Sequence, residues 1–194
     1  MLFEQADPEI YLLTTALGDQ LAGQIATWVM PISLIPDPLR LIVALSPTGQ
    51  TCQFIDRRGQ FFIHLLATDQ IPWLSHFGLY SGFDCDKFTG LDYQLTPSGL
   101  PHLKGTCAWA ECEVLWKIDT GDRYLFLAHS LHQSHDPTKH PLRLTQGRNG
   151  LSPAEQDQHR QKYEADIQRA RQLLQSADHW QMSPVAEKDI PRRE

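Results

Sequence analysis

The sequence lacks any apolar run that approaches the ~20 residues needed to cross a bilayer as a helix. Its first residues, Met1–Pro8, contain acidic side chains and no Lys or Arg, whereas a secretion signal begins with basic residues and continues into an apolar stretch. We therefore expect a cytoplasmic protein that does not associate with a membrane.

Cysteine is scarce, and its positions do not have the spacing of a zinc site. Cys-x-x-Cys pairs are absent, and a chain of 194 residues can build a core without disulfides. Cys107 and Cys112 are an odd number of residues apart, so a continuous strand would direct them to opposite faces. We expect Cys52, Cys85, Cys107 and Cys112 to be buried or free thiols.

The chain also lacks an excess of positive charge. Its 17 Lys and Arg residues stand against 23 Asp and Glu, giving a formal net charge of −6 that would repel a polyanion, so nucleic acid is not an expected partner. No Gly-x-Gly-x-x-Gly fingerprint is present, and the sequence therefore does not distinguish NADH from NADPH. A content of 41% hydrophobic and 21% charged residues is typical of a soluble globular protein.

What the sequence does contain is a series of short strand patterns. Each is rich in β-branched, aromatic or leucine residues and ends at a glycine, a proline or a polar turn. The patterns over 107–117 and 124–133 predict a hairpin with a glycine-containing turn. Together the patterns predict a mainly β barrel with helical additions. The predicted strands cover residues 9–18, 21–33, 39–45, 61–66, 107–117, 124–133 and 141–144.

Helical patterns are fewer. Residues 51–58 predict a short helix that Gly59 ends, and Thr68 is predicted to cap a second helix that continues to Phe77. Residues 80–103 are rich in Gly, Pro, Ser, Thr and Asp and are interpreted as a long loop with little regular structure. Long loops of this kind are often functional.

The C-terminal part begins with a strong helix start, because Ser152 can cap, Pro153 suits the first helical position and Glu155 completes a capping box. Apolar residues then recur at spacings of three and four, so one edge of the helix needs a surface on its own barrel or on a second chain. We divide the chain into a barrel of residues 1–150, an amphipathic helix of residues 151–180 and a loose tail of residues 181–194.

Two segments are candidates for a binding site. The turn Ser46–Thr51 has three hydroxyls and a glycine before a predicted helix, and free N–H groups there could bind a phosphate. An ordinary turn with Thr51 as helix cap explains the same pattern. In Ala26-Thr27-Trp28-Val29, small residues and a flat indole could receive a planar cofactor, while the alternative places Trp28 in the core or in a dimer interface.

Over residues 10–145 these segments occur in an order that resembles flavin reductase-like proteins of the flavoredoxin type. The resemblance rests on Gly23-x-x-Ala26-Thr27-Trp28-Val29-Met30-Pro31-x-Ser33, a proline-bearing loop and apolar strand at 36–45, the hydroxyl turn Ser46–Thr51, Phe61 to Leu66, Asp86-Lys87-Phe88 and Gly121-Asp122-Arg123.

The resemblance implies an FMN-binding split β-barrel that works as a homodimer, holds FMN non-covalently at the interface, and transfers electrons from NAD(P)H to flavin or another acceptor. No side chain is obligatory as acid or base for hydride transfer, so no catalytic residue is assigned. Small-molecule donors and acceptors and a second copy of the chain are the expected partners. The implied cofactor-binding residues are Ala26, Thr27, Trp28, Val29, Ser46, Thr48, Thr51, His64, Lys87 and Arg123.

Three positions depart from the family pattern. His64 replaces an asparagine, Arg123 replaces the histidine of a Gly-Asp-His turn, and the Ser46–Thr51 turn contains no Lys or Arg. Hydroxyls and N–H groups can still hold phosphate, and Lys87 or Arg123 could supply the charge.

Two other interpretations compete with a reductase. Split barrels host several functions, so a non-enzymatic flavin or haem-related binding module, or an electron carrier, is the main alternative. His129, His132, His135 and the nearby His140 suggest a metal site, but His129 and His132 would point to opposite faces of a strand. We therefore expect no metal site.

Overall fold

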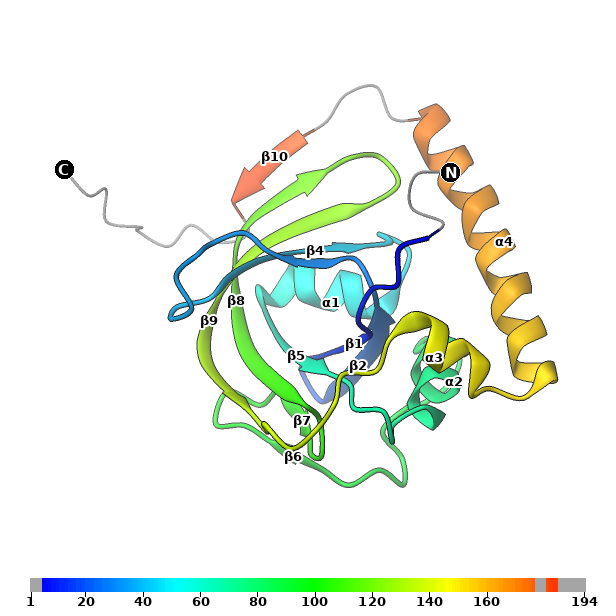
Figure 1. The fold of residues 1–194 in the computed structure, drawn as a ribbon. Helices are drawn as coiled ribbons and strands as arrows, with labels where there is room; N and C mark the ends of the chain where they lie inside the picture. The colour runs from blue at the N-terminus through cyan, green and yellow to red at the C-terminus, as the bar shows by residue number, and fades with distance from the viewer. Residues whose placement is uncertain (1–4, 177–180, 185–194) are drawn as a thin grey trace.

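One curled antiparallel sheet organises the chain (Figure 1). The computed structural model describes residues 5–176 and 181–184. The sheet has the strand order β2-β1-β5-β8-β9-β4-β3, and β10 pairs with β8 outside this path. This architecture confirms the mainly β split barrel.

The elements are β1 (Tyr11–Leu17), β2 (Gln20–Ala26), β3 (Val29–Pro31), β4 (Arg40–Leu45), α1 (Gln50–Arg58), β5 (Gln60–Leu65), α2 (Pro72–Gly78), β6 (Tyr93–Leu95), β7 (Pro101–Leu103), β8 (Ala108–Asp119), β9 (Tyr124–His135), α3 (Leu144–Asn149), α4 (Pro153–Ser176) and β10 (Gln181–Pro184).

The sheet is apolar on both faces near β1 and β5, which explains the nearly continuous apolar runs of these strands. Leu13, Phe61 and Ile63 belong to an inner cluster that also includes Cys52 and Ile55 of α1. A second cluster on the helical side of β1 joins Leu12 and Leu66 to Leu74 and Phe77 of α2. The two clusters fix α1 and α2 against the sheet, and α1 carries the candidate phosphate turn.

The long hairpin of β8 and β9 is present as predicted. Its register shifts twice, between Glu111 and Cys112 and between Val114 and Trp116, and such bulges increase the twist of a strand pair. All four cysteines are free thiols, as expected, and three of them are buried. Cys112 lies in the inner cluster, whereas Cys107 precedes β8 and its thiol contacts the carbonyl of Leu66.

Several predicted boundaries are wrong. The strand predicted over 21–33 is two strands, because β2 ends at Ala26 and β3 pairs with β4 instead of β1. The predicted helix does not start at Thr68, since the side chain of Gln70 accepts the N–H of Ala67 and holds a turn there. Helix α2 begins at Pro72, where proline suits the first helical position.

Other differences concern pairing that the sequence pattern does not reveal. The loop predicted over 80–103 contains the two-stranded sheet of β6 and β7. Residues 141–144 make only two isolated bridges, Glu9 with Arg143 and Ala67 with Pro141. Residues 181–184 form β10, although they were assigned to a loose tail, because the free edge of β8 at Trp116–Asp119 accepts them. The predicted tail over 185–194 lies outside the described residues.

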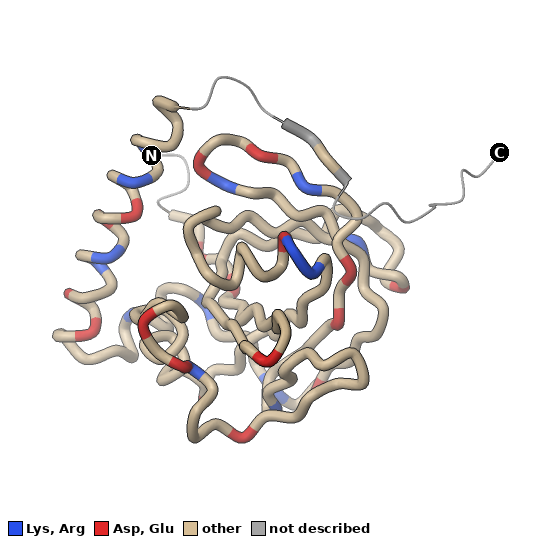
Figure 2. Tube along the Cα trace, turned by 180° about the vertical axis from the view of Figure 1, so that it is seen from behind, with Lys and Arg blue, Asp and Glu red and all other residues tan. Residues whose placement is uncertain are grey.

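Helix α4 starts with the predicted capping box. Glu155 accepts hydrogen bonds from the N–H and the hydroxyl of Ser152. Basic and acidic residues alternate along the helix (Figure 2), and none of its residues is buried. The ammonium of Lys162 donates to the carbonyls of Gly78 and Leu79 and so ties α4 to the C-terminus of α2. Among the described residues, no helix is long and apolar enough to span a membrane.

Candidate functional site

The turn between β4 and α1 presents unused backbone donors. Gly49, not Thr51, is the N-cap, and it provides no side-chain cap. In the described part of the chain, no acceptor is assigned to the N–H groups of Gln50, Thr51 and Cys52. No acidic residue lies in the first turn of α1. Free N–H groups and the positive end of a helix together favour an anion at this position.

Hydroxyl groups border the same turn. The side chains of Ser46 and Thr48 are 3.0 Å apart and hydrogen-bonded, and Thr48 is exposed. Thr51 is the second residue of α1 and only 3% exposed, so the alternative interpretation, in which Thr51 is the helix cap, is wrong. Its backbone N–H, at the helix start, is the group of Thr51 that suits an anion.

Trp28 and Arg123 meet next to this turn. Trp28 lies between β2 and β3, is 57% exposed, and accepts the N–H of Ala44 through its carbonyl. Arg123 lies in the β8–β9 turn, and its guanidinium stands 5.2 Å from the centre of the Trp28 ring. Leu45, the last residue of β4, pairs with Tyr124 in antiparallel register. Arg123 therefore lies at the end of β4, where the Ser46 turn begins.

Arg123 is held from its own turn as well. It donates a hydrogen bond of 2.6 Å to the carbonyl of Asp122, and the Asp122 carboxylate is 3.5 Å away. The carbonyl of Arg123 accepts from the N–H and the hydroxyl of Thr120. Gly121 has a φ of 92°, a conformation that glycine adopts without strain. The turn therefore places a fixed positive charge beside an exposed indole.

His64 does not join this group. Its side chain is completely buried on the face of β5 opposite Ile63, which lines a groove on the inner face. The ring Nδ1 donates to the carbonyl of Leu12, and Nε2 accepts the N–H of Leu103. Burial lowers the pKa of His64 to about 3. His64 is thus a neutral residue that joins β5 to β7, and the prediction that it touches the cofactor has no support from its position.

The ammonium of Lys87 is bound by backbone carbonyls of β2 and α2. The residue is 6% exposed and donates to the carbonyls of Gly23 and Phe77, at 3.1 and 2.9 Å. Burial lowers its pKa to about 8, and nearby Lys162 contributes to the decrease. This ammonium clamps α2 onto β2, so Lys87 does not supply the charge of the site. Ala26 is buried in the inner cluster, and Thr27 is half-buried beside it.

A groove of about 520 Å³ opens on the inner face of the sheet, and Val29 contributes to its wall. The side chains that line it are mostly apolar, with polar groups at one end. Beside the groove the β3–β4 segment exposes several large apolar residues, of which Leu34 is fully exposed. The lining residues are Tyr11, Val29, Pro31, Pro36, Leu39, Leu41, Ile63, Leu65, Ala108, Trp109, Ala110, Gln133, Ser134 and His135.

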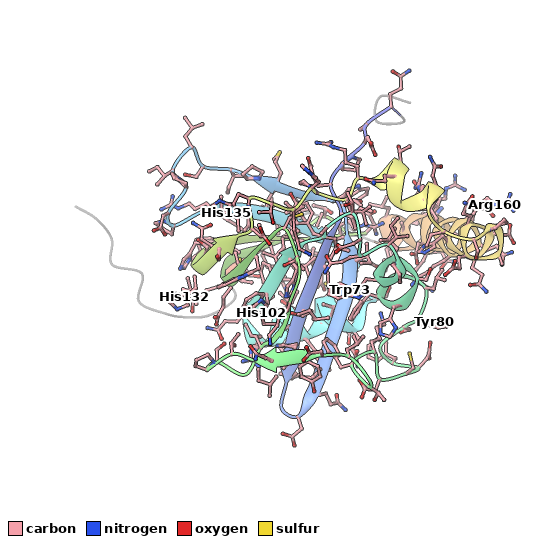
Figure 3. All side chains as sticks on the ribbon, turned by 60° about the horizontal axis from the view of Figure 1, so that its bottom comes forward. Trp73, Tyr80, His102, His132, His135 and Arg160 are labelled. Carbon is pink, nitrogen blue, oxygen red and sulfur yellow. The ribbon has the colours of Figure 1, made fainter. Side chains whose placement is uncertain are left out.

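The β9 histidines do not converge. His132 and His135 lie at separate points along the strand (Figure 3), and His129 contacts Glu113 at 3.9 Å. In the described residues, no group of three His, Cys, Asp or Glu side chains is arranged to hold a metal.

A second cavity, of about 510 Å³, was not identified from the sequence. It lies between the β1–β2 turn, the first residue of α1 and the segment 82–86. Only the length of the 80–103 loop could have indicated it, because the cavity forms from segments far apart in the chain.

Comparison with known proteins gives this geometry a context. A sequence model described as the flavin reductase like domain matches residues 8–150. The high molecular weight rubredoxin of Moorella thermoacetica is 32% identical over 120 residues, which are 61% of this chain and 52% of that protein. The flavin reductase of Pseudomonas putida is 33% identical over 88 residues, 44% of this chain and 50% of that protein. The chain therefore spans about half the length of these two relatives.

Solved structures share the fold. The NADH:FAD oxidoreductase of Streptomyces globisporus has a TM-score of 0.68 and 21% identity, and the match covers 75% of this chain and 86% of that chain. The curled sheet places the chain in the split-barrel class of folds. The chain belongs to the flavin reductase like family, as its sequence predicted.

Proposed function

We propose that this protein is a cytoplasmic, FMN-dependent oxidoreductase that transfers electrons from NADH or NADPH to flavin or another acceptor. The observation that carries the proposal is the convergence of the α1 N-terminus, Trp28 and Arg123 at one end of the sheet. Anion donors, an aromatic surface and a cation are the three features that a phosphorylated flavin needs.

The phosphate of FMN would lie at the Ser46–Thr51 turn. The N–H groups of Gln50, Thr51 and Cys52 would donate to it, and the exposed Thr48 hydroxyl would add a further hydrogen bond. No carboxylate of the first helical turn opposes the charge. The residues present therefore fit a phosphate without Lys or Arg inside the turn.

The flavin ring would pack near Ala26–Val29, with Trp28 offering the exposed indole and Arg123 the nearest fixed charge. When bound, the flavin supplies the redox chemistry, accepting a hydride from a nicotinamide. The protein positions the two rings and excludes water. Because the flavin supplies the redox chemistry, the site needs no side chain as acid or base.

A homodimer is part of the proposal. The apolar side chains of Met30, Ile32, Leu34 and Ile35 are exposed on one segment beside the apolar groove. Monomeric proteins rarely expose such contiguous apolar surface, and a self-complementary contact across a two-fold axis would bury it. A second copy would cover the Trp28 region as well, since Trp28 precedes this segment directly.

The names of the relatives suggest two kinds of acceptor. One relative is named a flavin reductase and another a high molecular weight rubredoxin, so we consider flavin and a partner protein as the two candidate acceptors. A non-enzymatic flavin-binding or electron-carrier role is the second candidate function, and the missing Gly-Asp-His histidine favours it.

An absorption spectrum tests the proposal. We expect the purified protein to take up FMN and to lose the visible flavin band when NADH or NADPH is added without oxygen. Bound flavin that neither nucleotide bleaches would favour the carrier function. A protein that takes up no added FMN would contradict both functions.

A further inference from the structure

The C-terminal strand β10 covers part of one edge of β8 (Figure 1). The pairing of β5 with this edge ends at Glu113, and the N–H of Val114 then donates to the carbonyl of Gly59. Farther along, the same edge pairs with β10 over Trp116–Asp119. A register shift between Val114 and Trp116 separates the two parts of β8. The end of β8 therefore depends on β10, and not on β5, for its backbone partner on this side.

The part of β8 that pairs with β10 leads directly into the turn that carries Arg123. Asp119 is the last residue of β8, and it pairs with Gln181. Its carboxylate accepts the N–H of Gly121 at 2.8 Å. The N–H and the hydroxyl of Thr120 donate to the carbonyl of Arg123, at 2.9 and 3.0 Å. These hydrogen bonds join the turn to the end of β8, so a displacement of that end would also displace Arg123.

The other strand of the hairpin has its own support. Strand β9 pairs with β4, and Tyr124 pairs with Leu45, so the residue after Arg123 is held whether or not β10 is present. The β8 side has an ion pair between Lys117 and Asp56 of α1, at 2.7 Å. A partly exposed ion pair of this kind contributes little, whereas the four residues paired with β10 fix the backbone itself. Without β10 the end of the hairpin would be held firmly on one side only.

The position of the Arg123 guanidinium is sensitive to such a loss. It lies 5.2 Å from the centre of the Trp28 ring, and attraction between a cation and an aromatic ring is significant to about 6 Å. We propose that β10 is a positioning strand for Arg123: its pairing with β8 fixes the turn and so keeps the guanidinium beside Trp28. The effect on flavin chemistry rests on the proposed function, whereas the effect on the turn does not.

Proline substitution within β10 of the full-length chain tests this proposal. Adjacent residues of a strand direct their N–H groups to opposite sides, so Met182→Pro/Ser183→Pro removes a donor from the ladder whichever residue provides it. Met182→Ala/Ser183→Ala is the matched control, because it changes the same side chains and keeps both N–H groups. Met182→Gly/Ser183→Gly keeps the donors but weakens the strand, so its effect should be intermediate.

The first measurement is amide hydrogen exchange by NMR on the flavin-free protein. We expect the N–H of Thr120 to exchange at least about tenfold faster in the proline variant and at the wild-type rate in the alanine variant. The N–H of Leu66, which donates to the carbonyl of Ile10, should stay protected and so show that the barrel is intact. If Leu66 also loses protection in the proline variant, the glycine variant decides the same comparison. Unchanged exchange at Thr120 would overturn the proposal.

The second measurement is the rate at which NADH reduces bound FMN. The proline variant should slow this reduction about as much as Arg123→Ala does, and the two changes together should slow it no further than Arg123→Ala alone. Additive effects would mean that β10 acts by a route other than Arg123, and they would overturn the proposal. Faster exchange at Thr120 in a protein that binds no FMN would support the positioning of the turn and contradict the proposed function instead.

Discussion

Arg123 is the cation of the candidate site, and it stands where the family resemblance implies a histidine. A guanidinium stays charged across the physiological pH range, whereas a histidine in the same turn would titrate. Trp28 and Asp122 hold Arg123 in place, so its charge is fixed in position as well as in sign. The Asp122 contact at 3.5 Å is compatible with a second interaction toward a ligand.

Replacing Arg123 by Ala should slow the reduction of bound flavin by NAD(P)H while the fold is kept, because the positive charge nearest to the ring is lost. Replacing it by His should introduce a dependence of the reduction rate on pH between about pH 5 and 8. Stopped-flow absorbance over this range is the measurement. Wild-type rates in both variants would place Arg123 outside the site.

The Thr48 hydroxyl tests the position of the phosphate. Thr48→Val should weaken the binding of FMN by about 1.5–3 kcal/mol if a charge-assisted hydrogen bond is lost. Riboflavin has no phosphate and should bind the variant as it binds the wild type. Fluorescence titration of both flavins provides the comparison, and equal weakening would contradict the assignment. Thr51 is less suitable for this test, because its buried side chain contributes to packing.

His64 should make the stability of the protein depend on pH. Burial holds its pKa at about 3 in the folded state, below the 6.5 of an exposed histidine. The unfolded chain therefore binds the proton more readily, so stability is present above pH 6.5 and is lost as the pH falls toward 3. We expect a loss of about 2 kcal/mol at pH 5.

Urea unfolding at pH 5 to 7.5 measures this effect. His64→Asn replaces the residue with one that does not titrate, so the slope of stability against pH should decrease even if the variant is less stable at every pH. An unchanged slope would mean that other groups cause the acid sensitivity. His102, whose ring stacks 5.7 Å from that of His64, is the first of these to examine.

At the scale of elements, Lys162 forms a polar link between α4 and the C-terminal end of α2. Lys162→Ala should leave the carbonyls of Gly78 and Leu79 without their ammonium donor and increase the mobility of α4. Limited proteolysis should then cut the variant within α4 sooner while the barrel stays intact. Arg169→Ala is the control, because Arg169 forms an ion pair with Asp166 of the same helix. Equal protection of Lys162→Ala and wild type would show that contacts other than those of Lys162 hold the helix.

The elements best predicted from the sequence are those whose patterns depend on residues close together in the chain. The β8–β9 hairpin and the Ser152–Glu155 helix start depend on neighbouring residues, and both were found. The second predicted strand breaks at Ala26 because the residues that follow pair with β4. No pattern within residues 21–33 reveals this break.

The candidate site was predictable in part for the same reason. Trp28 and the Ser46 turn carry local signals, whereas the direction of a side chain depends on the sheet. The family resemblance implied a cofactor role for His64 and Lys87, but their burial is fixed by β7 and α2, which pack from elsewhere in the chain. Gln50 and Gly82, which line the second cavity, had no signal, since the 80–86 segment approaches α1 only in the folded chain.

At the scale of the whole molecule, the largest unexplained feature is the apolar segment between β3 and β4. Leu34 is fully exposed and Ile35 is 62% exposed, although the adjacent groove is lined mostly by apolar side chains. Burial of apolar surface contributes roughly 25 cal/mol per Å², so covering this segment and the groove would favour association strongly. A second copy presents the same segment and the same groove, which makes a closed two-fold contact possible.

We therefore expect sedimentation to give twice the 22.1 kDa mass of the chain at micromolar concentration. Leu34→Asp should produce a monomer that remains folded, because the wild-type side chain makes no buried contact within its own chain. Leu174→Asp on α4 is the control for the added charge, since Leu174 is also exposed but lies far along the sequence from the groove. If the flavin pocket is completed by the partner, the Leu34→Asp monomer should also bind FMN more weakly. A wild-type protein that is monomeric with FMN bound would support the cofactor site and contradict a pocket shared between two chains.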